Sequence, residues 1–108
     1  MRTQSKQQDI DLWEAWIEYE QFSNNHFGTL YVLGEILVDS AATPPFLRKK
    51  EQAGVQLILQ TQPFYPGRSR RKEVLYSEPI RNLNQYSSIC IYDGAELIAE
   101  FDEIEILI

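Results

Sequence analysis

Histidine and cysteine each occur once in the 108-residue sequence, so the side chains that most often act as nucleophiles, general bases and metal ligands are scarce. His26 lies among asparagines in a stretch that predicts a turn, and Cys90 lies between two isoleucines in a stretch that predicts a strand. A catalytic triad needs a base beside its nucleophile, and zinc needs several nitrogen or sulfur ligands. The sequence therefore predicts neither a catalytic site nor a metal site.

Acidic side chains are the second group that could do chemistry. Glu103 and Glu105 lie two residues apart in a predicted strand, which places both side chains on one face at a separation of roughly 6.6 Å. Two carboxyl groups about 5–9 Å apart can hydrolyse a glycosidic bond. Because any solvated strand face produces this spacing, an acid-pair hydrolase is only the third functional hypothesis. Glycine-rich nucleotide loops are absent from the sequence, and no cofactor is expected.

The densest basic cluster lies at residues 68–72 and contains Arg68, Arg70, Arg71 and Lys72. These side chains could bind an anion or an acidic partner surface. Charge also keeps an exposed turn soluble and protects strand edges from pairing, and we favour that interpretation. The whole chain has a net charge of -6, so nucleic acid is not an expected partner.

Aromatic side chains are numerous, with two tryptophans, five phenylalanines and six tyrosines. An exposed platform of such rings on a sheet could stack against a sugar. Large aromatic side chains also supply much of the buried surface of a small sheet protein, and this is the favoured interpretation. A small-ligand- or carbohydrate-binding module is therefore an alternative function for the chain.

The cysteine count and the N-terminal sequence bear on the compartment. A single cysteine cannot form an internal disulfide, which argues against a small secreted scaffold. Residues 1–8 are polar, predict a disordered tail and lack the apolar stretch of a signal peptide. No apolar run reaches the ~20 residues of a membrane-spanning helix. We expect a cytoplasmic protein without membrane contact, with one folded domain at residues 9–108.

Residues 10–22 fit the periodicity of both a helix and a strand. Strand alternation is favoured because Trp13, Ala15, Ile17 and Tyr19 then share one face, opposite a row of glutamates. The other predicted strands cover residues 29–38, 55–61, 73–77, 86–92, 96–101 and 104–108.

Four of these strands carry further expectations. Residues 29–38 are apolar on both faces, which predicts a central strand covered on both sides, and Gly34 within it marks a bulge or a close backbone approach. The strand at 73–77 is expected to end before Pro79. Asp93 and Gly94 predict a type I′ turn between the strands at 86–92 and 96–101.

One short helix is expected, at residues 44–53. Thr43 can cap it, Pro44 suits its first position, and Gly54 is a typical stop. Residues 63–72 predict a loop. With about seven short strands and at most one or two short helices, the fold class is mostly β, a small antiparallel β-sandwich or a small barrel.

The last predicted strand carries the first functional hypothesis. Ile104, Ile106 and Ile108 share one face, and such an apolar strand needs cover from its own fold or from a partner. The favoured function is therefore a non-catalytic module that binds another protein or a second copy of itself. The three isoleucines are its possible interface, and enzymatic activity is not the favoured reading.

Overall fold

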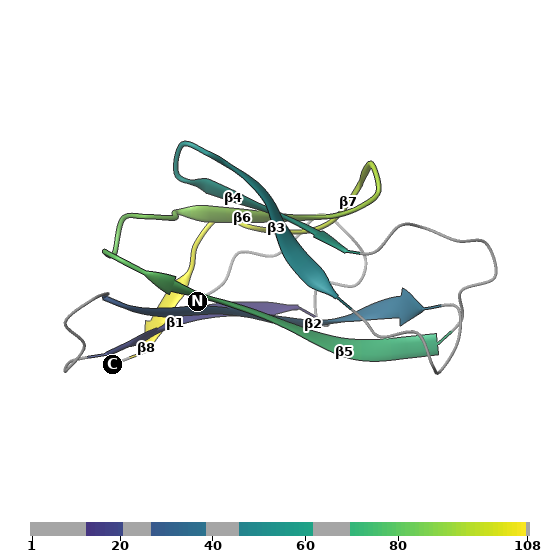
Figure 1. Cartoon of the computed structure of the whole chain (residues 1–108), viewed down its shortest axis with the longest axis horizontal. Coiled ribbons are helices and arrows are strands. Elements are labelled where there is room, and N and C mark those ends of the chain that lie inside the picture. Colours follow the sequence, from purple (N-terminus) through teal and green to yellow (C-terminus); the bar gives the residue numbers. More distant parts are fainter. Residues whose placement is uncertain (1–12, 21–26, 39–45, 62–69, 108) are drawn as a thin grey trace.

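The computed structural model describes residues 13–20, 27–38, 46–61 and 70–107, and these contain eight strands and no helix. They form two four-stranded sheets that lie one above the other (Figure 1). The predicted β-sandwich is therefore confirmed. The predicted tail at 1–8, His26, Arg68 and Ile108 lie outside the described residues. The strands are β1 (Glu14–Tyr19), β2 (Gly28–Val38), β3 (Leu47–Ala53), β4 (Gln56–Thr61), β5 (Arg70–Ile80), β6 (Ser88–Asp93), β7 (Glu96–Phe101) and β8 (Glu105–Leu107).

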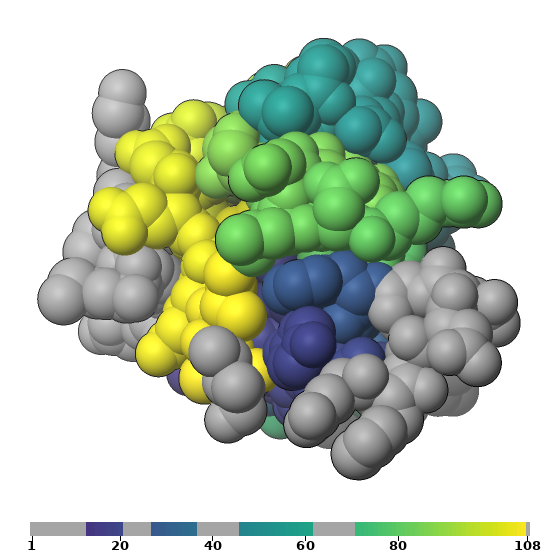
Figure 2. All heavy atoms as spheres, turned by 90° about the vertical axis from the view of Figure 1, so that its left-hand side faces the viewer, coloured from purple at the N-terminus to yellow at the C-terminus, as the bar shows by residue number. Residues whose placement is uncertain are grey.

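Sheet A has the strand order β5-β2-β1-β8, and sheet B has the order β3-β4-β6-β7. Both sheets are mixed and not purely antiparallel as expected, because β8 runs parallel to β1 and β6 runs parallel to β4. Parallel neighbours cannot be joined by a tight hairpin, and in both cases the chain passes through the other sheet before the second strand of the pair. Figure 2 shows the C-terminal segment passing from sheet B above to sheet A below.

The core lies between the two sheets and follows strand alternation. In β2 the side chains of Leu30, Val32 and Ile36 are buried, and in β4 those of Leu57 and Leu59 are buried. The strands predicted at residues 29–38 and 55–61 are therefore present, except that Val55 lies in the turn before β4 and is 51% exposed.

β2 is a central strand, as predicted, because β5 and β1 pair with its two edges. The prediction that both of its faces are covered is wrong for one face. Tyr31 and Leu33 point away from sheet B and stay partly exposed, since no described element packs over them. Sheet A therefore presents a partly apolar outer face.

β1 confirms that residues 10–22 contain a strand. Trp13, directly before it, is only 2% exposed, and its indole lies against Gly34 of β2. A Cβ atom at Gly34 would overlap the indole ring. The close backbone approach expected at Gly34 is thus present, while the pairing of β2 shows no bulge.

The helix predicted at residues 44–53 is wrong. Its described part is β3, which pairs antiparallel with β4 and has a bulge between Lys49 and Glu51. β3 is an edge strand in which only Leu47 is buried, so its exposed positions accept charged residues that also suit a helix. The ladder with β4 overrides the local helix signals.

Gly54 and Gly94 occupy equivalent turns of sheet B. Gly54 does not stop a helix; with Val55 it forms the two-residue turn between β3 and β4. The second turn is Gly94–Ala95 and not Asp93–Gly94, because Asp93 already pairs with Glu96. Both glycines have φ near +60°, and no other described residue has a positive φ, which fits a type II′ turn better than the predicted type I′.

β5 is longer than predicted at both ends. It begins at Arg70, inside the predicted loop, and it continues through Pro79 to Ile80. Proline lacks a backbone donor but is tolerated on an edge strand, and β5 is an edge of sheet A.

β8 forms the opposite edge of sheet A. Ile104 and Ile106 are partly buried and pack against the core, as the strand alternation predicts. Within the described ranges, no helix is long and apolar enough to cross a membrane.

Candidate interaction surface

The predicted basic cluster does not form one continuous surface in its described part. Arg71 and Lys72 are consecutive residues of β5, so their side chains lie on opposite faces of sheet A. Arg71 is exposed on the outer face, and Lys72 is half-buried on the inner side. A strand was not expected here, and strand alternation is the physical reason for the separation.

Two of the three predicted interface isoleucines lie in the described residues. Ile104 and Ile106 are partly buried and pack against the core of their own chain, and their role as an interface stays a prediction. Glu105 and Leu107 point the other way, toward the outer face of sheet A, and Leu107 is 44% exposed. Glu103 is exposed as well, so Glu103 and Glu105 lie in solvent and do not line a pocket with opposed environments.

The outer face of sheet A carries a partly exposed apolar band, formed by Trp16, Tyr31, Leu33 and Leu75. Strand pairing brings these four residues together. Leu75 of β5 lies opposite Leu33 of β2, and Tyr31 of β2 lies opposite Trp16 of β1. Leu75 is 55% exposed, and the other three are partly exposed. We call these four residues the outer band.

The two rings of the outer band stack on each other. The ring centroids of Trp16 and Tyr31 are 5.4 Å apart, and their planes meet at 22°. The indole Nε1 of Trp16 donates a hydrogen bond to Glu18 Oε2 at 3.0 Å. Each ring therefore covers one face of the other, and the indole is held in place by a neighbouring carboxylate.

Carboxylates surround the outer band. Glu35 of β2 lies directly opposite Glu73 of β5, in the row next to Leu33 and Leu75. Among the described strand residues, Arg71 is the one basic side chain of this face. The face is therefore apolar at its centre and negative at its rim. The carboxylates of the rim are Glu14, Glu18, Glu35, Glu73 and Glu105.

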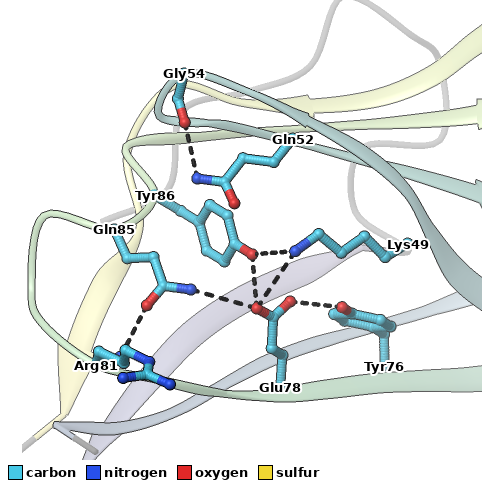
Figure 3. Close-up of polar contacts among 8 residues, drawn as sticks. All are labelled: Lys49, Gln52, Gly54, Tyr76, Glu78, Arg81, Gln85 and Tyr86. Atoms are coloured by element: carbon cyan, nitrogen blue, oxygen red, sulfur yellow. Dashed lines mark hydrogen bonds and ion pairs between the residues drawn. The ribbon is translucent and has the colours of Figure 1, made fainter.

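Apart from the outer band, a polar cluster lies between the sheets and is centred on Glu78 (Figure 3). Tyr76 and Tyr86 each donate a hydrogen bond to the Glu78 carboxylate at 2.6 Å, and Gln85 Nε2 donates another at 3.3 Å. Lys49 Nζ lies 2.8 Å from the Tyr86 hydroxyl and 3.7 Å from Glu78 Oε2. These five residues are called the Glu78 cluster below.

The Glu78 cluster joins the edges of the two sheets. Glu78 and Tyr76 come from β5 of sheet A, and Lys49 comes from β3 of sheet B. Burial, followed by the hydrogen bond to Glu78, raises the pKa of Tyr76 above its usual value. The hydrogen bond to Tyr86 raises the pKa of Lys49, although burial opposes it. Because the polar groups of the cluster bind one another, the cluster connects the two sheets through hydrogen bonds and an ion pair.

Cys90 lies outside the core cluster, on the outer face of sheet B, where it pairs with Ile58 and Glu100. It is nevertheless buried, because Gln56 Nε2 reaches its Sγ at 3.2 Å and Glu100 Oε2 lies 3.8 Å away. Burial, followed by the nearby Glu100 charge, raises the pKa of the thiol. A thiol with a raised pKa is a poor nucleophile at neutral pH.

The described residues include no group of three or more histidine, cysteine, aspartate or glutamate side chains that could hold a metal ion. No protein-family model matches the chain, and no curated protein or solved structure matches it either. The outer band and its acidic rim are the strongest candidate for a functional surface among the described residues, although neither was predicted from the sequence. The sequence of β1 did indicate this surface, because Trp16 lies between Glu14 and Glu18 on the face opposite the predicted apolar row.

Proposed function

We propose that the chain is a non-catalytic protein-interaction module that binds a partner protein on the outer face of sheet A. The observation that carries the proposal is the outer band, in which two leucines and a stacked Trp–Tyr pair lie together on the outer face of sheet A and are all at least partly exposed. Contiguous apolar surface with a polar rim is typical of interaction sites. Tryptophan and tyrosine are also the side chains that most often dominate binding energy.

A carbohydrate- or small-ligand-binding module is less well supported by the same residues. A sugar ring stacks on the free face of an aromatic ring, and several binding rings usually lie side by side. In the outer band, Trp16 and Tyr31 stack on each other, and the Trp16 indole nitrogen is occupied by Glu18. A flat protein partner can use the edges of both rings together with Leu33 and Leu75. We also propose that the protein acts in the cytoplasm.

The test is a selection of random peptides, displayed on phage, against the immobilised protein. Selected peptides should bind the parent chain but lose at least tenfold in affinity for a Leu75→Asp variant, because a charge then interrupts the outer band. A Val55→Asp variant is the matched control, since Val55 is 51% exposed but lies in the β3–β4 turn of sheet B. Thermal unfolding would show that both variants remain folded.

Two results would contradict the proposal. The first is a set of selected peptides that bind the parent and the Leu75→Asp variant equally well. The second is repeated selection without any peptide that depends on the outer band. A concentration-dependent mass in sedimentation, abolished by Leu75→Asp but not by Val55→Asp, would instead identify a second copy as the partner.

A further inference from the structure

We infer that the partner of the outer face of sheet A is cationic: a segment of another protein in which lysine or arginine flanks apolar side chains. This inference rests on the proposed function and specifies the chemistry of the partner. The apolar residues of the segment would lie on the outer band, and its cations would meet the acidic rim.

Glu35 and Glu73 place like charges at paired positions of sheet A. They lie directly opposite each other on adjacent antiparallel strands, in a partly exposed row. Like charges in this position destabilise a sheet. No cation from the described part of the chain forms an ion pair with either carboxylate. A cation from a partner would remove this repulsion. The loss of the repulsion and the new ion pair would then both favour binding.

The Glu35–Glu73 pair lies in the row next to the two leucines of the outer band. Glu35 and Glu73 each lie two residues along their strands from Leu33 and Leu75. Side chains two apart on a strand share a face at a spacing of roughly 6.6 Å. The same spacing separates alternate residues of an extended segment. An apolar residue and a basic residue two positions apart in the partner would therefore match both rows.

The charge of the outer face disfavours a symmetric pair of identical copies on it. In a two-fold contact the same surface meets itself. The acidic rim of one copy would then lie against the acidic rim of the other, while Arg71 is the one described basic side chain available on each face. The net charge of -6 adds to this repulsion. A cationic partner of different sequence has the complementary charge.

The experiment uses three synthetic peptides of equal length with the same alternating apolar residues and with lysine, glutamine or glutamate at the polar positions. Each is titrated into the isotope-labelled full chain and followed by NMR. The lysine peptide should shift the signals of Trp16, Leu33 and Leu75. It should bind about tenfold more tightly than the glutamine peptide, and the glutamate peptide should bind most weakly. Added salt should reduce the difference.

A pair of double variants separates a specific contact from general attraction to an acidic protein. Glu35→Gln with Glu73→Gln should weaken binding of the lysine peptide by about tenfold, the upper range for two exposed ion pairs. Glu51→Gln with Glu96→Gln removes the same formal charge from exposed positions of sheet B, and it should leave the affinity nearly unchanged. Equal losses in the two double variants would overturn the inference.

The remaining outcomes distinguish the two proposals. Glutamine and lysine peptides that bind equally well, both with signal changes at the outer band, would overturn the cationic partner but leave the interaction module in place. Signal changes confined to sheet B, or no changes with any of the three peptides, would contradict the interaction module as well.

Discussion

At Gly34, packing leaves no room for a side chain. The Trp13 indole occupies the space that a side chain at position 34 would need. Gly34→Ala should therefore lower the free energy of unfolding by about 1–3 kcal/mol, the usual cost of overpacking a core. Urea denaturation would measure the change. Ser77→Ala, on the exposed side of β5, is the control and should change stability by less than about 0.5 kcal/mol.

A double variant tests the cause of that loss. Trp13→Phe makes the ring smaller, so Gly34→Ala should cost less in the Trp13→Phe background than in the parent chain. Equal costs in both backgrounds would mean that the loss has another origin.

The raised pKa values of Tyr76 and Lys49 make the stability of the fold depend on pH. Both pKa values are raised in the folded chain, above the ordinary values of 10.0 and 10.5. A raised pKa means that the folded state binds the proton more tightly, so the contribution is complete below pH ~10 and declines as the pH rises further. Urea unfolding between pH 7 and 11 should show stability falling above pH ~10, with a shallower fall in a Tyr76→Phe variant. An unchanged slope in that variant would contradict the role of Tyr76.

At the scale of elements, the β6–β7 hairpin depends on the positive φ of Gly94. Gly94→Val should destabilise the chain by about 1 kcal/mol or more, because β-branched residues resist this conformation. Ala95→Val is the control, since Ala95 has no positive φ, and it should cost clearly less. Similar thermal shifts for both variants would place the constraint elsewhere in the turn.

The sequence was most informative where hydrophobic alternation was strong. The strands predicted at residues 29–38 and 55–61 correspond to β2 and β4, although Val55 lies in a turn. The hairpin between β6 and β7 was also predicted, apart from a shift of one residue in its turn. β3 was missed because its charged residues, capping signals and final glycine fit a helix locally. Only the pairing with β4, a contact that depends on the fold, makes it a strand.

The candidate site was harder to predict for the same reason. Trp16 in β1 and Leu75 in β5 are far apart in the sequence, and β2 alone brings them to one face. The separation of Arg71 from Lys72 likewise required the knowledge that β5 begins at Arg70. Single-strand patterns indicate which face a residue takes, but not which strands become neighbours.

At the scale of the whole molecule, β8 closes the edge of sheet A beside β1. Deleting residues 104–108 would remove the packing of Ile104 and Ile106, and full burial of such a side chain contributes roughly 1.5–3 kcal/mol. It would also leave one edge of β1 unpaired. We expect the truncated chain to unfold or aggregate, as measured by circular dichroism and sedimentation.

Two other results of the truncation would be informative. A folded chain that has lost an oligomeric state would identify the strand as an interface element, as the isoleucine pattern alone first indicated. A folded chain of unchanged mass would mean that the strand is needed for neither purpose.

The parallel pairing of β1 with β8 also determines when the fold can be completed during synthesis. Trp16 pairs with Glu105, so β1 gains its second neighbour only after residues 105–107 have left the ribosome. The β1–β2 and β3–β4 hairpins can form early, because their partners are adjacent in the sequence. Contacts between distant segments slow folding, typically to milliseconds or seconds in all-β proteins. Until β8 has emerged, one edge of β1 stays unpaired, and the nascent sheet is most exposed to aggregation during that interval.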